Sequence, residues 1–210
     1  MLITRYKITF VSLAAILTCL GCNNTETSPQ SVPSTTEQLD TLPDIHQDIL
    51  TFVKMGRAAV AGNDGTQLMT SAKGLNALGA TPLNDTDDLA KNWAVAAQSM
   101  PGGDKTKSIP YRGRVKGPAY RTQTLKPGET EKIEDVYYAA EAVEMSLSAL
   151  NPSPLQWEIA EYDTKEDPVC NGKANSEAQL CRFTPLWTTK YQIRISNISD
   201  QDVTYLFITN

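Results

Sequence analysis

The chain has 210 residues, of which 40% are hydrophobic and 20% are charged, and its formal net charge at pH 7 is -5. That length suits one medium-sized domain or two small ones. A nucleic-acid-binding protein needs a basic face for the phosphates, so this negative charge argues against a DNA or RNA partner. His46 is the only histidine, which leaves few ways to build a catalytic or zinc site.

The N-terminal segment is typical of an exported protein. Arg5 and Lys7 precede an uncharged run over residues 8–20. A membrane-spanning helix needs about 20 apolar residues, so the run is too short for a span and long enough for a signal peptide. Leu20-Gly21-Cys22 resembles the bacterial lipobox, in which the signal is cleaved before a lipid-modified cysteine. We therefore expect a lipoprotein signal peptide over residues 1–21 and a lipid on Cys22. The alternative is an ordinary secretory signal with a chance cysteine.

Residues 22–43 contain many Ser, Thr, Pro, Asn and Gln residues and almost no large apolar side chains. Such a segment cannot bury enough surface to offset the entropy lost on ordering, so it is predicted to be a disordered tether. The expected location is the bacterial cell envelope, with the protein attached to a membrane through its lipid. Asn23 follows the modified cysteine, where an aspartate would retain a lipoprotein in the inner membrane, so the outer membrane is favoured.

A helical domain is expected over residues 44–100. Apolar residues recur at spacings of three and four over residues 45–60, 66–78 and 89–100, which predicts three short helices. The acidic cluster at residues 84–88 precedes the third helix, where it would cap free amides. His46 lies in the first helix between acidic neighbours and is expected to face solvent.

Residues 101–114 are predicted to be a linker, and residues 115–210 an antiparallel β-sandwich. Three late segments alternate apolar and polar residues with a period of two, as half-buried strands do: 155–163, 190–198 and 202–210. Residues 129–134 fit a strand, and residues 135–147 fit a helix by composition, although 142–147 also alternate as a strand does. Strands are favoured, because a helix there would interrupt the sheet. The predicted fold class is therefore α+β, a small three-helix domain followed by a sandwich.

The cysteine count predicts one disulfide bond. Cys19 leaves with the signal and Cys22 is acylated, so Cys170 and Cys181 remain as a pair. In an exported protein an even remainder indicates a disulfide. A two-cysteine metal site lacks ligands, because the only histidine is far away in sequence, so no metal or cofactor is expected.

Residues 113–210 resemble the pre-peptidase C-terminal-like β-sandwich domains of bacteria. The resemblance rests on a Pro127-Gly128 turn before a strand, a strand that ends at Asp163, the aromatic-Pro-aromatic segment 183–187, and a closing Tyr-x-Phe-x-x-Asn over residues 205–210. It implies an accessory or ligand-binding module without catalytic activity. Acidic residues that could bind calcium in that family correspond here to Gln156 and Glu158, so metal binding is not expected.

No enzymatic motif is present, and the protein is predicted not to be an enzyme. There is no G-x-S-x-G, H-E-x-x-H or P-loop, although carboxylates paired only in space would escape detection. An exposed aromatic platform is one way to hold a sugar ring, and the candidates are Trp187, Tyr120 and Tyr138. Trp157 alternates in phase with apolar neighbours and is assigned to the core. The expected function is a non-catalytic binding module for a carbohydrate or an envelope protein. The alternatives are a docking lipoprotein whose helices bind a partner and, less favoured, a hydrolase.

Overall fold

The computed structural model describes residues 42–83, 88–103 and 117–210. The predicted signal peptide, Cys22, nearly all of the tether and most of the predicted linker lie outside these residues. Residues 39–210 form one compact unit.

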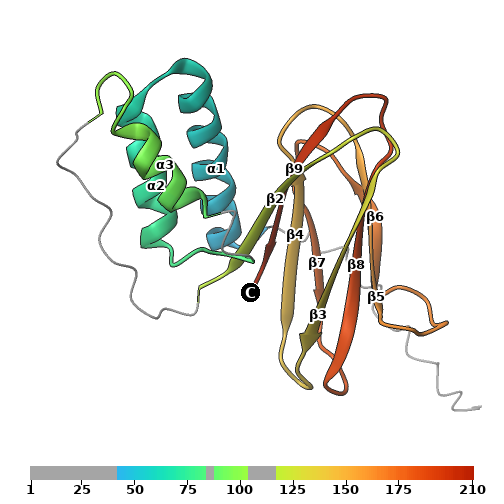
Figure 1. Cartoon of the computed structure of the whole chain (residues 1–210). Helices are drawn as coiled ribbons and strands as arrows, with labels where there is room; N and C mark the ends of the chain where they lie inside the picture. The colour runs from blue at the N-terminus through green and yellow to red at the C-terminus, as the bar shows by residue number, and fades with distance from the viewer. Residues whose placement is uncertain (1–41, 84–87, 104–116) are drawn as a thin grey trace, which may run out of the picture. The chain divides into compact units, whose positions relative to one another are not determined.

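Three helices lead the described chain, as the spacing predicts: α1 (Asp44–Gly62), α2 (Gly65–Ala77) and α3 (Leu89–Ala97) (Figure 1). Two of them begin at an aspartate that caps the first turn. The Asp64 carboxylate accepts a hydrogen bond from the backbone N–H of Gln67 (3.0 Å), and Asp88 accepts one from Lys91 (3.1 Å). The capping role expected for the acidic cluster is therefore confirmed at Asp88.

The helices approach one another closely at two glycines. A Cβ atom placed on Gly56 of α1 would lie 2.1 Å from the ring of Trp93 on α3, and one on Gly74 of α2 would lie 2.3 Å from the ring of Phe52 on α1. Each aromatic ring therefore packs directly on the backbone of the neighbouring helix. This contact explains why two residues with poor helix propensity occur in helix interiors.

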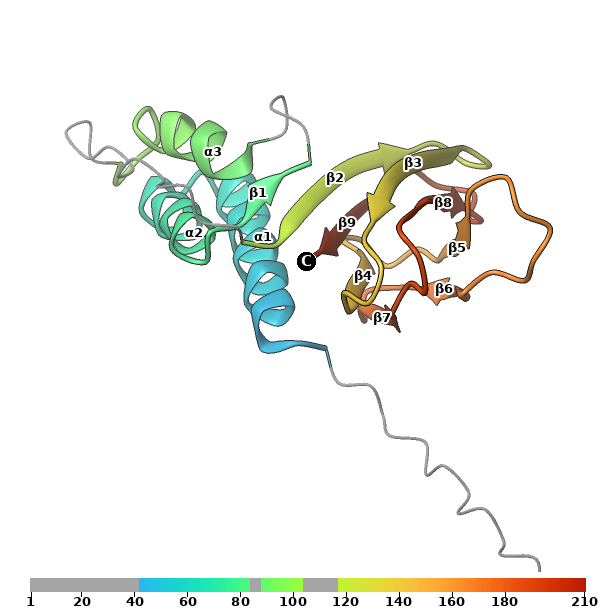
Figure 2. The same ribbon diagram turned by 90° about the horizontal axis from the view of Figure 1, so that it is seen from below.

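In the described part of the chain, nine strands form two sheets, which confirms the α+β fold with a sandwich (Figure 2). Sheet A has the order β1-β2-β9-β4-β7 and sheet B the order β3-β8-β5-β6. All pairs are antiparallel except β1 with β2. Residues 129–149 form strands, as predicted. The strands are β1 (Thr81–Pro82), β2 (Ala119–Leu125), β3 (Thr130–Tyr137), β4 (Val143–Ala149), β5 (Leu155–Glu161), β6 (Cys170–Ala174), β7 (Gln179–Phe183), β8 (Thr189–Asn197) and β9 (Val203–Thr209).

The core between the two sheets follows the period of two. Leu155, Trp157 and Ile159 of β5 are buried there, while Gln156 on the same strand is exposed. The expectation that Trp157 belongs to the core is confirmed. On the side where β2 passes into β3, the Glu131 carboxylate accepts hydrogen bonds from Arg121 of β2 and from the hydroxyl of Tyr205 on β9. This ionic cluster joins the two sheets.

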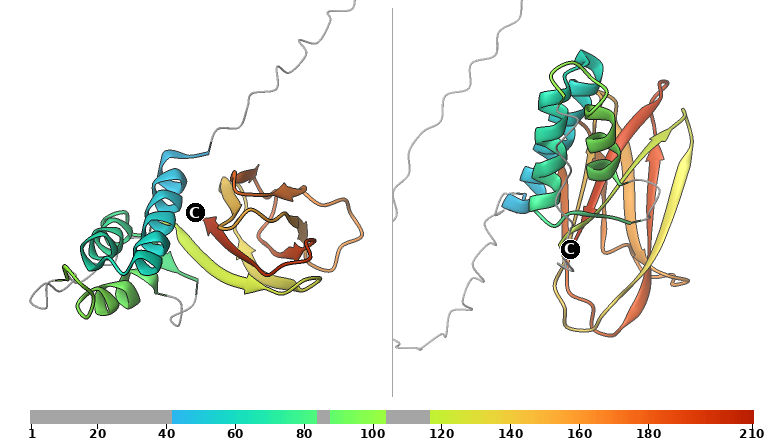
Figure 3. Two further views of the ribbon diagram at one scale, coloured as in Figure 1. Left: turned by 90° about the horizontal axis from the view of Figure 1, so that it is seen from above. Right: turned by 60° about the vertical axis from the view of Figure 1, so that its left-hand side comes forward.

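A second core lies between the helices and the outer face of sheet A. Leu206 and Ile208 of β9 and Tyr120 of β2 are buried there together with residues of α1, α2 and α3. Figure 3 shows the helices gathered on one side of the strands. Strand β1, which lies between α2 and α3 in the sequence, pairs with β2. The hydroxyl of Tyr120 also accepts a hydrogen bond from the first backbone N–H of α3, at Leu89 (2.8 Å). The helices are thus a layer of the fold, covering one sheet.

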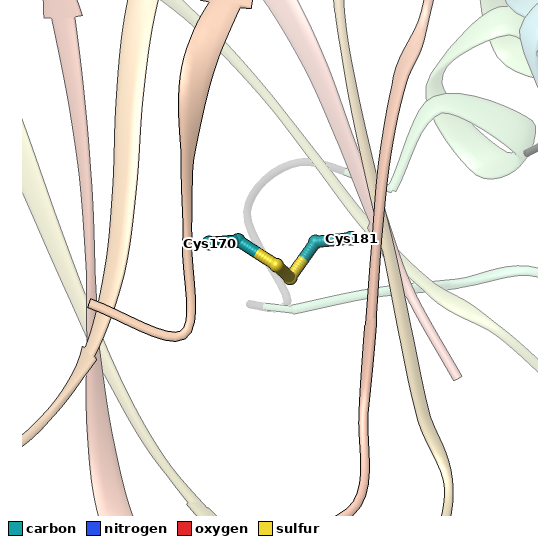
Figure 4. The surroundings of a disulfide bond; sticks show 2 residues. All are labelled: Cys170 and Cys181. Carbon is teal, nitrogen blue, oxygen red and sulfur yellow. A yellow bond between two sulfur atoms is a disulfide. The ribbon is translucent and has the colours of Figure 1, made fainter. Parts of the chain in front are cut away.

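The predicted disulfide is confirmed between Cys170 and Cys181 (Figure 4). Cys170 lies on β6 and Cys181 on β7, which are edge strands of opposite sheets, and their Cα atoms are 6.0 Å apart. A crosslink at this point joins the two sheets on the side opposite the Glu131 cluster. Loop-closure arguments assign a disulfide of this span about 3 kcal/mol.

The prediction that His46 faces solvent is wrong. His46 is 1% exposed, and its Nδ1 lies 3.0 Å from the Oγ of Ser146 on β4. It is in helical phase with the buried Ile49, Leu50 and Val53, so the ring faces sheet A with them. Burial lowers the pKa of His46, and the ring is therefore neutral near pH 7. Ser146 is also buried, at 2% exposure, so the pair is inaccessible to a substrate.

Candidate functional site

The outer face of sheet B is open to solvent and polar. Residues there include the exposed Lys132 of β3, Gln156 of β5 and Arg194 of β8. A groove of about 380 Å³ crosses this face and continues beneath the turn that follows β5. It is lined by Lys132, Glu158, Ala160, Glu161, Tyr162, Asp163, Thr164, Glu166, Pro168, Gln192 and Arg194.

The groove forms around a small residue. Ala160 points to the outer face in phase with Gln156 and Glu158, and its cross-strand partner is Gln192. The neighbouring side chains are longer, and the methyl group of Ala160 is too small to fill the space between them. Beyond β5 the chain turns through Asp163, whose φ of 58° is left-handed, and residues 163–168 form the far wall of the groove.

A chain of polar contacts orders the floor of the groove. Arg194 pairs with Glu158 across the sheet (3.4 Å) and donates through Nε to Gln192 (2.6 Å). Gln192 in turn donates to Glu134 (3.3 Å), which also pairs with Lys190 (3.3 Å). Both hydrogen-bond donors and acceptors are therefore held in fixed positions along three strands.

Aromatic side chains border the groove at the β5–β8 end. Trp187 is 56% exposed, and its Nε1 donates a hydrogen bond to Oε1 of Glu161 (3.2 Å). The same carboxylate oxygen accepts a hydrogen bond from Thr189 (3.1 Å). Tyr162 is 46% exposed, and Nζ of Lys190 lies 4.7 Å from its ring centroid. Glu161 thus connects the groove to the indole beside it.

This end of the sandwich has a packed aromatic base. Tyr137, Phe183 and Tyr191 contact one another with ring centroids 4.9–6.1 Å apart. Burial raises the pKa of Tyr137 to about 12, so its hydroxyl keeps its proton at physiological pH. Phe183 and Tyr191 lie on the two strands that flank the loop carrying Trp187, which gives that loop a firm base.

The three predicted aromatic ligand-binding residues lie in different environments. Trp187 is exposed and hydrogen-bonded to the lining residue Glu161, but it does not itself line the groove. Tyr138 is 60% exposed just after β3, in a loop bonded to the Trp187 loop through Ala139 N–H and Thr188 Oγ1 (3.0 Å). It does not line the groove and instead borders a separate hollow of about 230 Å³. The prediction that Tyr120 binds a ligand at the surface is wrong. Its side chain is fully buried between sheet A and the helices, so it cannot belong to an exposed aromatic platform.

Sequence reasoning missed most of the groove, including Lys132, Ala160, Tyr162, Gln192 and Arg194. These residues come from three strands and one turn, and only the strand register brings them together. The sequence did indicate part of this surface. Glu158, Gln192 and Arg194 alternate with apolar residues in segments predicted to be half-buried strands, so their side chains were expected to point outward.

Within the described ranges, no group of three or more His, Cys, Asp or Glu side chains is arranged to hold a metal ion. Across the same part of the chain, every helix is too short or too polar to cross a membrane.

Comparisons with known proteins give similarity to solved structures only. No protein-family model matches the chain, and no curated protein matches it. A pre-peptidase C-terminal domain of collagenase from Bacillus anthracis has a TM-score of 0.39 and 16% identity, covering 43% of this chain and 87% of that one. A periplasmic inhibitor of g-type lysozyme from Aeromonas hydrophila has a TM-score of 0.35 and 10% identity, over 44% and 84%. The Yersinia pseudotuberculosis-derived mitogen has a TM-score of 0.38 and 10% identity, over 46% and 86%. At these scores the similarities say nothing about what the chain binds.

Proposed function

We propose that this protein is a non-catalytic binding module of the bacterial cell envelope, and that it binds a carbohydrate in the groove on the outer face of sheet B. The observation that carries the proposal is the half-exposed Trp187, held by Glu161, a residue that also lines the groove. A ligand that lies in the groove and extends past Glu161 would contact both the polar floor and the indole.

The chemistry of the lining favours a sugar. Saccharide hydroxyls donate and accept hydrogen bonds, and the groove offers donors at Lys132, Gln192 and Arg194 beside acceptors at Glu158 and Glu161. Exposed aromatic faces such as those of Trp187 and Tyr162 present apolar area to the C–H face of a sugar ring. A phosphate-rich ligand is disfavoured, because four carboxylates line the groove.

The same four carboxylates raise the hydrolase alternative, and their surroundings argue for binding. Glu158 is paired with Arg194, and Glu161 accepts hydrogen bonds from Trp187 and Thr189. Asp163 and Glu166 are exposed. A general acid on a glycosidase requires a carboxyl group kept protonated by burial or by a close second carboxylate. None of these four side chains is buried.

Binding to an array of bacterial glycans, including peptidoglycan fragments and lipopolysaccharide oligosaccharides, tests the proposal. Ala160→Tyr fills the groove with a residue suited to an exposed strand, and we expect it to abolish binding. Trp187→Ala should weaken binding about tenfold, since aromatic stacking contributes roughly 0.5–1.5 kcal/mol beyond area burial. Gln156→Tyr, on the same face of the same strand outside the groove, should bind as the unaltered protein does.

Two results would count against this function. If the unaltered protein bound no glycan on the array, a carbohydrate ligand would be ruled out. An envelope protein would then become the better candidate ligand. If the Ala160→Tyr and Gln156→Tyr variants bound the glycan equally well, the groove would not be the binding site.

The proposal includes membrane attachment through a lipid on Cys22, supported by the lipobox-like Leu20-Gly21-Cys22 and by a disulfide of the kind that persists in exported proteins. The placement we propose is the outer membrane. Intact-mass measurement of the protein purified from membranes should show a chain that begins at Cys22 with added diacylglycerol. An unmodified Cys22 thiol would contradict the anchor without affecting the groove.

A further inference from the structure

A second cavity, distinct from the groove, lies between the helices and sheet A. It encloses about 330 Å³ and is lined by Val53, Arg57, Val60 and Ala61 of α1, Leu89 and Trp93 of α3, and Thr122 of β2. This volume is at the lower end of the range for small-molecule sites. The walls are mostly apolar, so the cavity disfavours a ligand that is polar along its whole length.

The shape of the cavity follows from the packing of Trp93. The indole lies against the backbone of α1 because Gly56 has no side chain to displace it. Trp93 is 9% exposed and Val53 is fully buried, so both contribute fixed walls, while Val60 is 47% exposed. The space therefore opens to solvent along the C-terminal half of α1.

Of the described residues that line this apolar space, Arg57 is the charged one. Arg57 is exposed, and among the described residues it forms neither an ion pair nor a hydrogen bond with another side chain. Among the described residues, no carboxylate lines the cavity to neutralise it. A guanidinium group is a strong hydrogen-bond donor to carboxylates, with a planar shape that matches them.

We propose that this cavity binds a free medium-chain monocarboxylate, with its alkyl chain against Val53, Trp93 and Leu89 and its carboxylate on Arg57. Apolar walls together with the Arg57 guanidinium select an amphipathic anion over a neutral alkane or a sugar. The occupant differs in chemistry from the glycan proposed for sheet B, so neither site depends on the other.

Titration of the purified protein with sodium decanoate below its micelle concentration tests the proposal, followed by calorimetry and by tryptophan fluorescence. We expect saturable binding of one decanoate per chain, with a change in Trp93 emission that persists in the Trp187→Ala variant. Arg57→Gln should weaken decanoate binding by about tenfold to a hundredfold, the effect of losing a charge-assisted hydrogen bond, and should leave 1-decanol binding unchanged.

Two further variants separate the cavity from general effects. Ala61→Leu keeps a good helix former at an exposed position and fills part of the cavity, so it should abolish binding of both decanoate and 1-decanol. Lys73→Gln removes one exposed positive charge from α2, away from the cavity, and should change neither affinity. Circular dichroism confirms that each variant is folded.

The proposal fails if decanoate shows no saturable binding, or if Ala61→Leu binds it as tightly as the unaltered protein. A loss of decanoate and 1-decanol binding by the same factor in Arg57→Gln would overturn the role of Arg57 as the carboxylate ligand. Loss of decanoate binding in Trp187→Ala would place the ligand at sheet B and overturn the assignment to this cavity.

Discussion

The outer faces of the two sheets differ in character although both come from strands of similar length. On sheet A, Leu206, Ile208 and Ser146 point outward and are buried under the helices. On sheet B, Lys132, Gln156 and Arg194 point outward and are exposed. The difference lies in side-chain chemistry, because apolar or small residues permit a helix to pack closely and charged residues keep their hydration.

This contrast assigns different roles to the two faces. The covered face contributes stability, since its burial adds a second hydrophobic core to the one between the sheets. The open face contributes little to stability and is available for a ligand. Substitutions on the two faces should therefore separate folding from binding.

The largest effect is expected from Leu206→Ala on the covered face. Leu206 is 1% exposed, and removal of a buried leucine side chain costs about 2–5 kcal/mol through lost burial and the cavity left behind. The matched substitution on the open face is Gln156→Ala, which should change the free energy of unfolding by less than about 0.5 kcal/mol. Urea denaturation of both variants measures the difference. Equal losses would contradict the contrast between the faces.

A smaller effect is expected where α3 packs on α1. Gly56→Ala would place its Cβ 2.1 Å from the Trp93 ring, and overpacking of this kind costs about 1–3 kcal/mol. Alanine's better helix propensity recovers up to about 1 kcal/mol, so a net loss of stability should remain. Gly62→Ala at the end of the same helix meets nothing within 4 Å and should be neutral or slightly stabilising. If the two variants were equally stable, the close contact of Trp93 with α1 would be wrong.

The smallest effect concerns protonation beneath the helices. The pKa of His46 is lowered chiefly by burial and further by Arg182, while Glu144 opposes the shift. The unfolded chain therefore takes up the proton first as the pH falls below about 6.5, and stability is full above that pH and decreases below it. One proton limits the slope to about 1.4 kcal/mol per pH unit. Thermal unfolding at pH 7.5 and 5.5 should show a smaller decrease in His46→Gln than in the unaltered protein. Identical decreases would assign the pH dependence to other groups.

Periodicity in the sequence was sufficient to predict most helices and strands and the core between the two sheets. The helices over residues 44–97, the core phase of β5 and β8 and the Cys170–Cys181 disulfide follow from spacing and cysteine count. Strands β6 and β7 were not predicted, because each has five residues and its alternation is mostly between partly buried and exposed positions. They are strands because β6 pairs with β5 and β7 pairs with β4, and these pairings cannot be read from the short segments themselves.

Contacts across the layers could not be predicted from one segment at a time. The run Tyr205-Leu206-Phe207-Ile208 is apolar on both faces, which indicates a strand buried on two sides, but it does not say what covers the second side. His46 was assigned to solvent from its acidic neighbours, although its spacing to Ile49 and Leu50 matched the buried face. Tyr120 was predicted to be a surface aromatic because the residues around it do not indicate that its hydroxyl would accept a hydrogen bond from Leu89 at the start of α3.

The pairing of β1 with β2, together with the Tyr120 hydroxyl at the start of α3, ties the helical segment to the sheet through the backbone as well as through side chains. The strands therefore depend on the helices to keep the outer face of sheet A buried. A recombination event that transferred the strands without the helices would leave Leu206 and Ile208 facing water. The loops around the sheet B groove make no contact of this kind with the helices, so sequence changes there should affect folding less.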